Sequence, residues 1–138
     1  MMRVFFAVLA LLVLYFPIAL VLNKSSQPDP TLLSGPFIRF ADSNAFISYP
    51  VIPGATPDDE DHPEQSTLSL FEDGRQLGPA HSVHRDVTVE GRGRYSFWRD
   101  NGTMLIFSTS DNSDPNTNGR TYRASDPGAR DPFEAQRR

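Results

Sequence analysis

The chain of 138 residues contains no cysteine, which excludes a disulfide scaffold, a thiolate metal site, a cysteine nucleophile and a lipid-modified cysteine. Basic residues are also few, because 13 Lys and Arg stand against 17 Asp and Glu, for a formal net charge of −4. Sequence-independent binding to nucleic acid needs clustered Lys and Arg, so we expect no nucleic-acid partner. The lack of cysteine fits either side of a membrane and indicates no compartment.

The chain is rich in apolar residues only at its start. All residues from 1 to 22 are hydrophobic except Arg3 and Pro17, and the stretch from Val4 to Leu22 carries no charge. As a helix this stretch would rise roughly 28 Å, close to the thickness of the bilayer core. We therefore predict a transmembrane signal anchor at residues 1–22, which places the protein in the cell membrane as a single-pass protein with an extracytoplasmic C-terminal part. A cleaved signal peptide is the alternative, although no small-x-small cleavage site ends the apolar run.

The rest of the chain is predicted to form one small domain. Residues 23–36 are rich in Ser, Pro and Asp, which is typical of a flexible tether. The β-domain is expected at residues 37–124, and it includes an acidic loop at 53–65 whose composition disfavours order. Residues 125–138 are predicted to be a disordered tail. So few hydrophobic residues follow the anchor that a large core with a deep catalytic cleft is disfavoured.

Short apolar runs alternate with turn signals along the domain, and no sustained helical period follows the anchor, so we expect an all-β fold. Asn101-Gly102 marks a hairpin whose arms carry apolar residues on both faces. We predict a small antiparallel sandwich or partly open barrel, preceded by one transmembrane helix. The hairpin should be covered by a second sheet on one side and by loops or a partner on the other. The expected strands span residues 37–41, 45–52, 67–71, 76–77, 84–90, 94–98, 103–109 and 120–124.

Aromatic, amide, carboxylate and guanidinium side chains are mixed in and after the hairpin. Such a mixture suits sugars, because aromatic faces stack on C–H surfaces and planar polar groups form paired hydrogen bonds with hydroxyls. These groups would share one surface if the polar segment Ser108–Tyr122 folds back along the hairpin. The alternative is that Tyr95 and Trp98 belong to the core and that Arg120 bonds the loop. The candidate ligand-binding residues are Arg94, Tyr95, Trp98, Asp111, Asn112, Asn118 and Arg120.

The same polar segment contains the first half of a calcium-loop pattern. Asp114, Asn116 and Asn118 have the spacing at which alternate side chains supply oxygen ligands. The position of the final Glu holds Ser125, and the alternative is a series of Asx turns in which these side chains bond their own backbone. We predict no cofactor other than a possible calcium ion at this loop. The contiguous acids 58–61 suit a metal less well, because they lack a defined turn.

The sequence contains no established catalytic motif. There is no G-x-S-x-G nucleophile turn and no glycine-rich phosphate loop, and Gly91-Arg92-Gly93-Arg94 indicates only a turn. His81 and His84 with Asp86 form a weak metal-ligand set, because residues three apart in an extended segment face opposite sides. We therefore assign no catalytic residue. A small hydrolase that uses His81 or His84 is the least favoured function.

Residues Gly93–Tyr122 (GRYSFWRDNGTMLIFSTSDNSDPNTNGRTY), together with Ser69–His84, resemble a β-rich module that recurs in bacterial proteins. This module often accompanies glycosyltransferase-like, methyltransferase-like or other envelope-polymer enzymes. The resemblance covers residues 66–124 and implies an accessory role in surface-polysaccharide biology, with no catalytic residue to transfer. Phe97 stands where the module is associated with a histidine. The predicted function is a membrane-tethered binding or interaction module for a glycan or an envelope-polymer enzyme, and the alternative is a structural partner subunit of a membrane complex.

Overall fold

The computed structural model describes residues 15, 17, 18 and 31–129. The predicted anchor from Val4 to Leu22 lies outside these residues, apart from Tyr15, Pro17 and Ile18. In the described part of the chain, no helix has both the length and the apolar character needed to cross a membrane. Most of the predicted tether and the end of the predicted tail also lie outside it.

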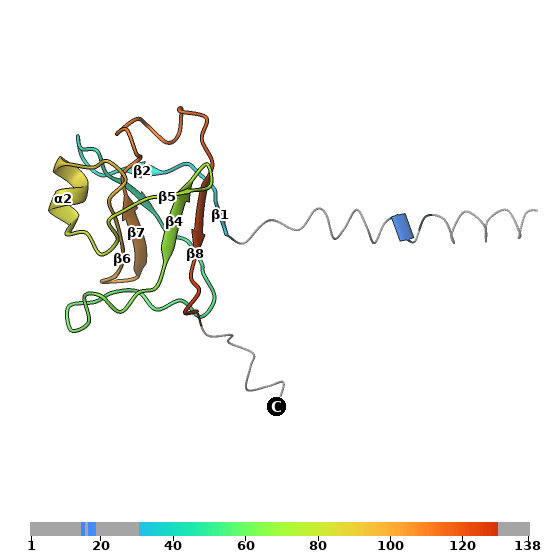
Figure 1. Cartoon of the computed structure of the whole chain (residues 1–138), viewed down its shortest axis with the longest axis horizontal. Helices are drawn as coiled ribbons and strands as arrows, with labels where there is room; N and C mark the ends of the chain where they lie inside the picture. The colour runs from blue at the N-terminus through green and yellow to red at the C-terminus, as the bar shows by residue number, and fades with distance from the viewer. Residues whose placement is uncertain (1–14, 16, 19–30, 130–138) are drawn as a thin grey trace, which may run out of the picture.

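Two four-stranded sheets pack face to face, and all neighbouring strands are antiparallel (Figure 1). The predicted all-β sandwich is therefore confirmed, and the sheets of the described residues do not close into a barrel. The first sheet has the order β1 (Leu32–Leu33), β8 (Tyr122–Ser125), β4 (Ser69–Glu72), β5 (Arg75–Gln76). The second has the order β2 (Ile38–Arg39), β3 (Phe46–Ser48), β7 (Thr103–Phe107), β6 (Tyr95–Arg99).

The core lies between the two sheets and is rich in aromatic rings. Phe37 packs edge-on against Phe107 and Tyr122, with ring centroids 5.3 and 5.6 Å apart. Alternate residues of the β6–β7 hairpin point into this core, as the period of two predicted. The buried residues of the core are Leu33, Phe37, Phe46, Leu68, Leu70, Leu77, Tyr95, Phe97, Leu105, Phe107, Tyr122 and Ala124.

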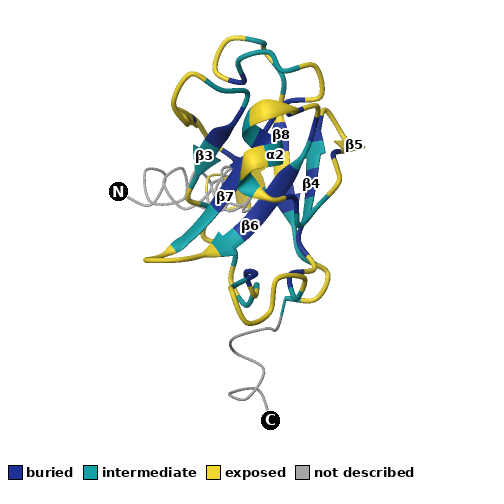
Figure 2. Cartoon of the chain, turned by 90° about the vertical axis from the view of Figure 1, so that its left-hand side faces the viewer, coloured by how far each residue is buried: buried dark blue, intermediate teal, exposed yellow. Residues whose placement is uncertain are grey.

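A short helix, α2 (His84–Val89), covers the outer face of the second sheet (Figure 2). Val87 is fully buried there against Ala45 and Ile106, whereas Val89 is exposed. The prediction of a strand at residues 84–90 is therefore wrong. A strand would place Val87 and Val89 on the same face. In the helix their side chains point in different directions, so Val87 alone packs against the outer face of the sheet. The helix ends where Gly91, at φ 63°, donates its N–H to the carbonyl of Asp86.

The domain extends beyond both of its predicted ends. Leu32 and Leu33 pair with β8, so the first sheet already begins within the predicted tether 23–36. At the other end Ser125 still belongs to β8, although it was expected to start the tail. These ends are ordered by ladder hydrogen bonds, which the sequence composition of a tether or tail does not reveal.

The acidic loop is ordered along the outer edge of β6, contrary to the prediction that its composition disfavours order. Asp58 is fully buried and forms a parallel bridge with Trp98. The Asp58 N–H donates to the carbonyl of Phe97 at 2.8 Å, and the Arg99 N–H donates to the carbonyl of Asp58 at 2.8 Å. Backbone pairing with a sheet edge therefore orders this loop, even though it contributes few apolar side chains.

Candidate functional site

The polar segment Ser108–Tyr122 folds as consecutive Asx turns at one end of the sandwich, opposite the end that carries the acidic loop (Figure 1). The Asp111 carboxylate accepts the Ser113 N–H at 3.1 Å. The Asn118 carbonyl oxygen likewise accepts the Arg120 N–H at 3.0 Å. The turn alternative raised by the sequence is thus the one that the structure adopts, because these side chains satisfy their own backbone.

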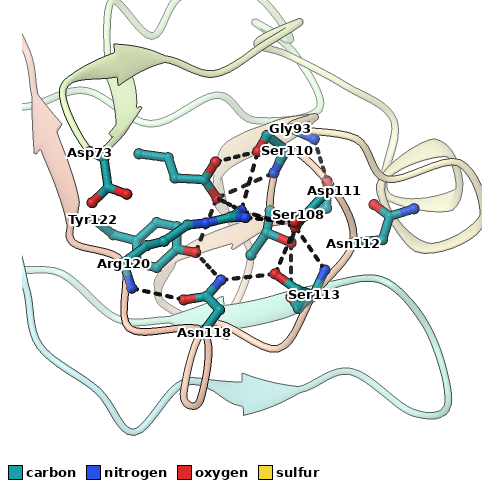
Figure 3. A network of polar contacts seen from close by, with 12 residues as sticks. Asp73, Gly93, Ser108, Ser110, Asp111, Asn112, Ser113, Asn118, Arg120 and Tyr122 are labelled. Atoms are coloured by element: carbon teal, nitrogen blue, oxygen red, sulfur yellow. Dashed lines mark hydrogen bonds and ion pairs between the residues drawn. The ribbon is translucent and has the colours of Figure 1, made fainter.

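Arg120 is the centre of a polar network that joins this loop to the first sheet (Figure 3). Its guanidinium lies 2.6 and 2.9 Å from the two carboxylate oxygens of Asp111 and 3.2 Å from Glu72. The Tyr122 hydroxyl donates to Glu72 at 3.1 Å, and the Asn118 amide donates to that hydroxyl at 2.8 Å. The polar groups of Asp111, Asn118 and Arg120 are therefore engaged in one network of bonds within the chain, although Asp111 itself is exposed.

The pKa values in this network follow from these contacts. Hydrogen bonds from Arg120 and Ser113 hold the pKa of the Asp111 carboxyl well below its usual range. Burial, with the neighbouring Glu72 carboxylate, raises the pKa of Tyr122 to about 12. Both groups thus keep a fixed charge state near neutral pH, as suits a structural network.

The predicted residues Arg94 and Asn112 lie together beside the C-terminal end of α2. Arg94 forms an ion pair with Glu90 of the last helical turn. Asn112 accepts the Arg92 N–H at 2.6 Å and donates to the Glu90 carbonyl at 3.1 Å. These two side chains hold the turn after the helix, and they are not part of the Arg120 network.

Tyr95 belongs to the core, since it is 2% exposed and its hydroxyl donates to the Leu68 carbonyl at 3.0 Å. Trp98 lies at the other end of the sandwich from Asp111 and Arg120, beside the acidic loop. The structure therefore does not bring the seven predicted ligand residues onto one surface. As the alternative proposed, Tyr95 belongs to the core and Arg120 bonds the polar loop.

The oxygens of the predicted calcium loop are engaged in hydrogen bonds. Asp114 accepts the Asn116 N–H at 2.8 Å and contacts Arg39, while Asn116 exchanges two hydrogen bonds with the backbone of Phe37. Across the described residues, no group of three or more His, Asp or Glu side chains is arranged to hold a metal. Binding of calcium by Asp114, Asn116 and Asn118 stays a prediction, and it would require these bonds to break.

Trp98 forms a wall shared by two hollows on the outer face of the second sheet. The half-buried indole lies edge-on to the His84 imidazole, with ring centroids 5.7 Å apart. The first hollow, of about 360 Å³, is mostly apolar and is lined by Pro63, His81, Ser82, Val83, His84, Ser96 and Trp98. The second, of about 590 Å³, is lined by Asp59, Glu60, Asp61, His84, Trp98, Arg99, Asp100 and Met104.

A buried carboxylate orients one histidine of the apolar hollow. Asp58 accepts the Ser66 N–H at 2.8 Å, and its second oxygen lies 2.7 Å from His81 Nδ1. Because an ionised carboxylate only accepts hydrogen bonds, Nδ1 carries the proton and leaves Nε2 as the acceptor of the neutral ring. His81 also has a positive φ of 53°. Sequence reasoning missed Asp58, because nothing in the run of acids 58–61 distinguishes it from its neighbours.

His84 should make the stability of the domain depend on pH. Its Nε2 is a buried atom without a hydrogen-bond partner in the described residues, and burial lowers the pKa of the ring below 6.5. The unfolded chain then binds the proton first, so this contribution to stability is complete above pH about 6.5 and declines as the pH falls toward the folded pKa. We expect His84→Phe, which keeps a ring beside Trp98, to reduce this decline in urea unfolding of the full chain. His62→Gln, at an exposed histidine, should leave it in place, and equal pH profiles for wild type and His84→Phe would contradict the prediction.

Comparisons of the chain with protein-family models, with curated proteins and with solved structures found no match. The resemblance of residues 66–124 to an envelope-associated module therefore stays a prediction.

Proposed function

We propose that the protein is a membrane-tethered, extracytoplasmic module that binds a glycan at Trp98. The observation that carries this proposal is the half-buried indole between two adjoining hollows, one apolar and one polar. A concave apolar surface with a few convergent polar groups is the usual form of a ligand site. The membrane tether is proposed from the apolar run Val4 to Leu22.

The chemistry around Trp98 suits a sugar. The indole face offers a stacking surface for a pyranose ring, and the carboxylates of Glu60, Asp61 and Asp100 offer acceptors for hydroxyl groups. No other described side chain forms a hydrogen bond or ion pair with these three carboxylates. With Asp59 the second hollow has four carboxylates against one guanidinium, that of Arg99. This balance favours neutral or amino-bearing glycans over acidic ones.

The proposal can be tested with the only tryptophan of the chain as the reporter. Neutral oligosaccharides of glucose and of N-acetylglucosamine should change the Trp98 fluorescence of the full chain. In calorimetry, Trp98→Ala should bind the same sugar about tenfold more weakly or worse, since each 1.4 kcal/mol of lost stacking and burial is tenfold in affinity. Val51→Ala, at an exposed apolar residue, should bind as the wild type does. Lack of binding by the wild type, or equal binding by Trp98→Ala, would contradict the proposal.

The Asp58–His81 pair favours a second candidate, a small hydrolase. His81 Nε2 could accept a proton from a water molecule as that water attacks the carbonyl carbon of an ester in the apolar hollow, and could return the proton to the alcohol oxygen as its bond to that carbon breaks. In that case His81→Gln should lower the hydrolysis of p-nitrophenyl acetate by at least about a hundredfold, while His62→Gln should retain it. Hydrolysis no faster than in buffer, or full activity of His81→Gln, would exclude this role. The alternative that the sequence favours over a hydrolase, a structural partner subunit, has less support here, because α2 already covers part of the outer sheet face.

A further inference from the structure

Trp98 belongs to a row of side chains that crosses three strands of the second sheet. Met104 of β7 faces Trp98 of β6, and Leu105 of β7 faces Ser48 at the end of β3. β3 ends at Ser48, and extending its register by one residue places Tyr49 opposite Met104. Tyr49 thus follows the end of β3 beside Met104 of β7, and Met104 in turn faces Trp98 of β6.

This row lies on the outer face of the sheet. Ile47 packs in the outer cluster with Val87 of α2, and side chains two apart along a strand point to the same side, so Tyr49 projects outward as well. Tyr49 is 63% exposed, and Met104 and Trp98 are partly exposed. Figure 2 shows α2 in front of this face, with the ends of β6 and β7 nearer the acidic loop extending beyond it. The helix covers the row through Ile47, whereas in the row through Tyr49 its His84 lies edge-on to Trp98 and Tyr49 is exposed.

The spacing of the two aromatic residues suits a chain of sugars. Neighbouring strands lie about 4.8 Å apart, so two strand spacings separate Trp98 from Tyr49 by about 10 Å. That distance is close to the length of a disaccharide unit in an extended glycan. A sugar ring on Trp98 and the next but one on Tyr49 could therefore stack at the same time, with Met104 beneath the ring between them.

We infer that the ligand is an oligosaccharide that lies across β6, β7 and β3 and stacks on both Trp98 and Tyr49. This inference rests on the proposed glycan function and extends it from one stacking site to two. A peptide added as a strand fits less well, because the backbone of β6 at this edge is already paired with Asp58 and Ser82. The carboxylates of the acidic loop beside the row disfavour a polyanionic chain.

The dependence of affinity on chain length tests the inference. The full chain is titrated by calorimetry with a monosaccharide, a disaccharide and a tetrasaccharide of N-acetylglucosamine and, separately, of glucose. The wild type should bind the tetrasaccharide at least about tenfold more tightly than the monosaccharide. Tyr49→Ala should lose most of this gain, whereas Tyr49→Phe should keep it because the ring is retained. Val51→Ala, at an exposed apolar residue two positions further on, is the matched control and should behave as the wild type.

The outcomes separate this inference from the function on which it rests. Equal affinities for the short and long sugars, or an unchanged gain in Tyr49→Ala, would overturn the inference that the sugar stacks on both Trp98 and Tyr49. A single sugar site at Trp98 would remain. Unchanged sugar binding by Trp98→Ala would overturn the proposed function itself. Binding of an oligolysine peptide, lost in Trp98→Ala, with no binding of either sugar series would overturn both in favour of a cationic peptide.

Discussion

Replacing Glu72 with alanine should destabilise the domain by about 1–3 kcal/mol, because it leaves the buried Tyr122 hydroxyl without its acceptor. Glu72 is 7% exposed, and its carboxylate accepts hydrogen bonds from Ser110 and from the Tyr122 hydroxyl while it contacts Arg120. The substitution leaves the buried hydroxyl and part of the guanidinium without acceptors, and it disconnects the Asx-turn loop from β4. Urea unfolding of the full chain, followed by the fluorescence of Trp98, measures the loss.

Two further variants separate the charge of Glu72 from its hydrogen bonds. Glu72→Gln keeps an acceptor for the Tyr122 hydroxyl but loses the charge that faces Arg120, so its loss should be smaller than that of Glu72→Ala. Glu60→Ala removes an exposed carboxylate without a partner in the described residues and should change stability by no more than about 0.5 kcal/mol. A Glu72→Ala protein as stable as Glu60→Ala would mean that the network around Arg120 does not stabilise the fold.

The strands of the two hairpins were predictable because each pair is separated by a local turn signal, whereas β1 was not predicted. Asp73-Gly74 separates β4 from β5, and Asn101-Gly102 lies between β6 and β7, so the hairpins follow from the sequence. Helix α2 was not predictable from periodicity. It has only six residues, and Val87 and Val89 fit a strand pattern equally well until the packing against Ile106 is known.

The functional residues were partly predictable, and the errors share one physical cause. Composition drew attention to Trp98, which lines both hollows, since an aromatic residue on a hairpin is a good candidate for stacking. It could not show that the side-chain oxygens of Asp111 and Asn118 accept hydrogen bonds from nearby backbone N–H groups. Nor could it pair Asp58 with His81, because that contact exists only after the acidic loop has added its backbone to the edge of β6. Contacts between distant segments depend on the tertiary fold, which a local pattern does not contain.

Replacing Asp58 with alanine should cost about 3–5 kcal/mol of stability and also disturb the Trp98 site. The carboxylate is fully buried and accepts hydrogen bonds from the Ser66 backbone and from His81, and hydrogen bonds to a charged acceptor contribute about 1.5–3 kcal/mol each. The Asp58 backbone is hydrogen-bonded to Phe97 and Arg99, the two neighbours of Trp98 on β6. A shift of the loop should therefore also displace the Trp98 indole. Urea unfolding and sugar titration of the same variant measure the two effects. Stability within about 1 kcal/mol of the wild type would contradict this account.

Asp58→Asn is the variant that distinguishes a binding site from a hydrolase. The asparagine carbonyl can still accept the Ser66 N–H, so most of the stability should be kept. Its amide, however, donates to His81 Nδ1, which moves the imidazole proton to Nε2. A base that acts through Nε2 would then lose its acceptor, as happens when the orienting aspartate of a catalytic triad is replaced. Stacking on Trp98 does not involve that proton. We therefore expect Asp58→Asn to bind the oligosaccharide with wild-type affinity, and a large loss of binding without a loss of stability would instead place His81 Nε2 in direct contact with the ligand.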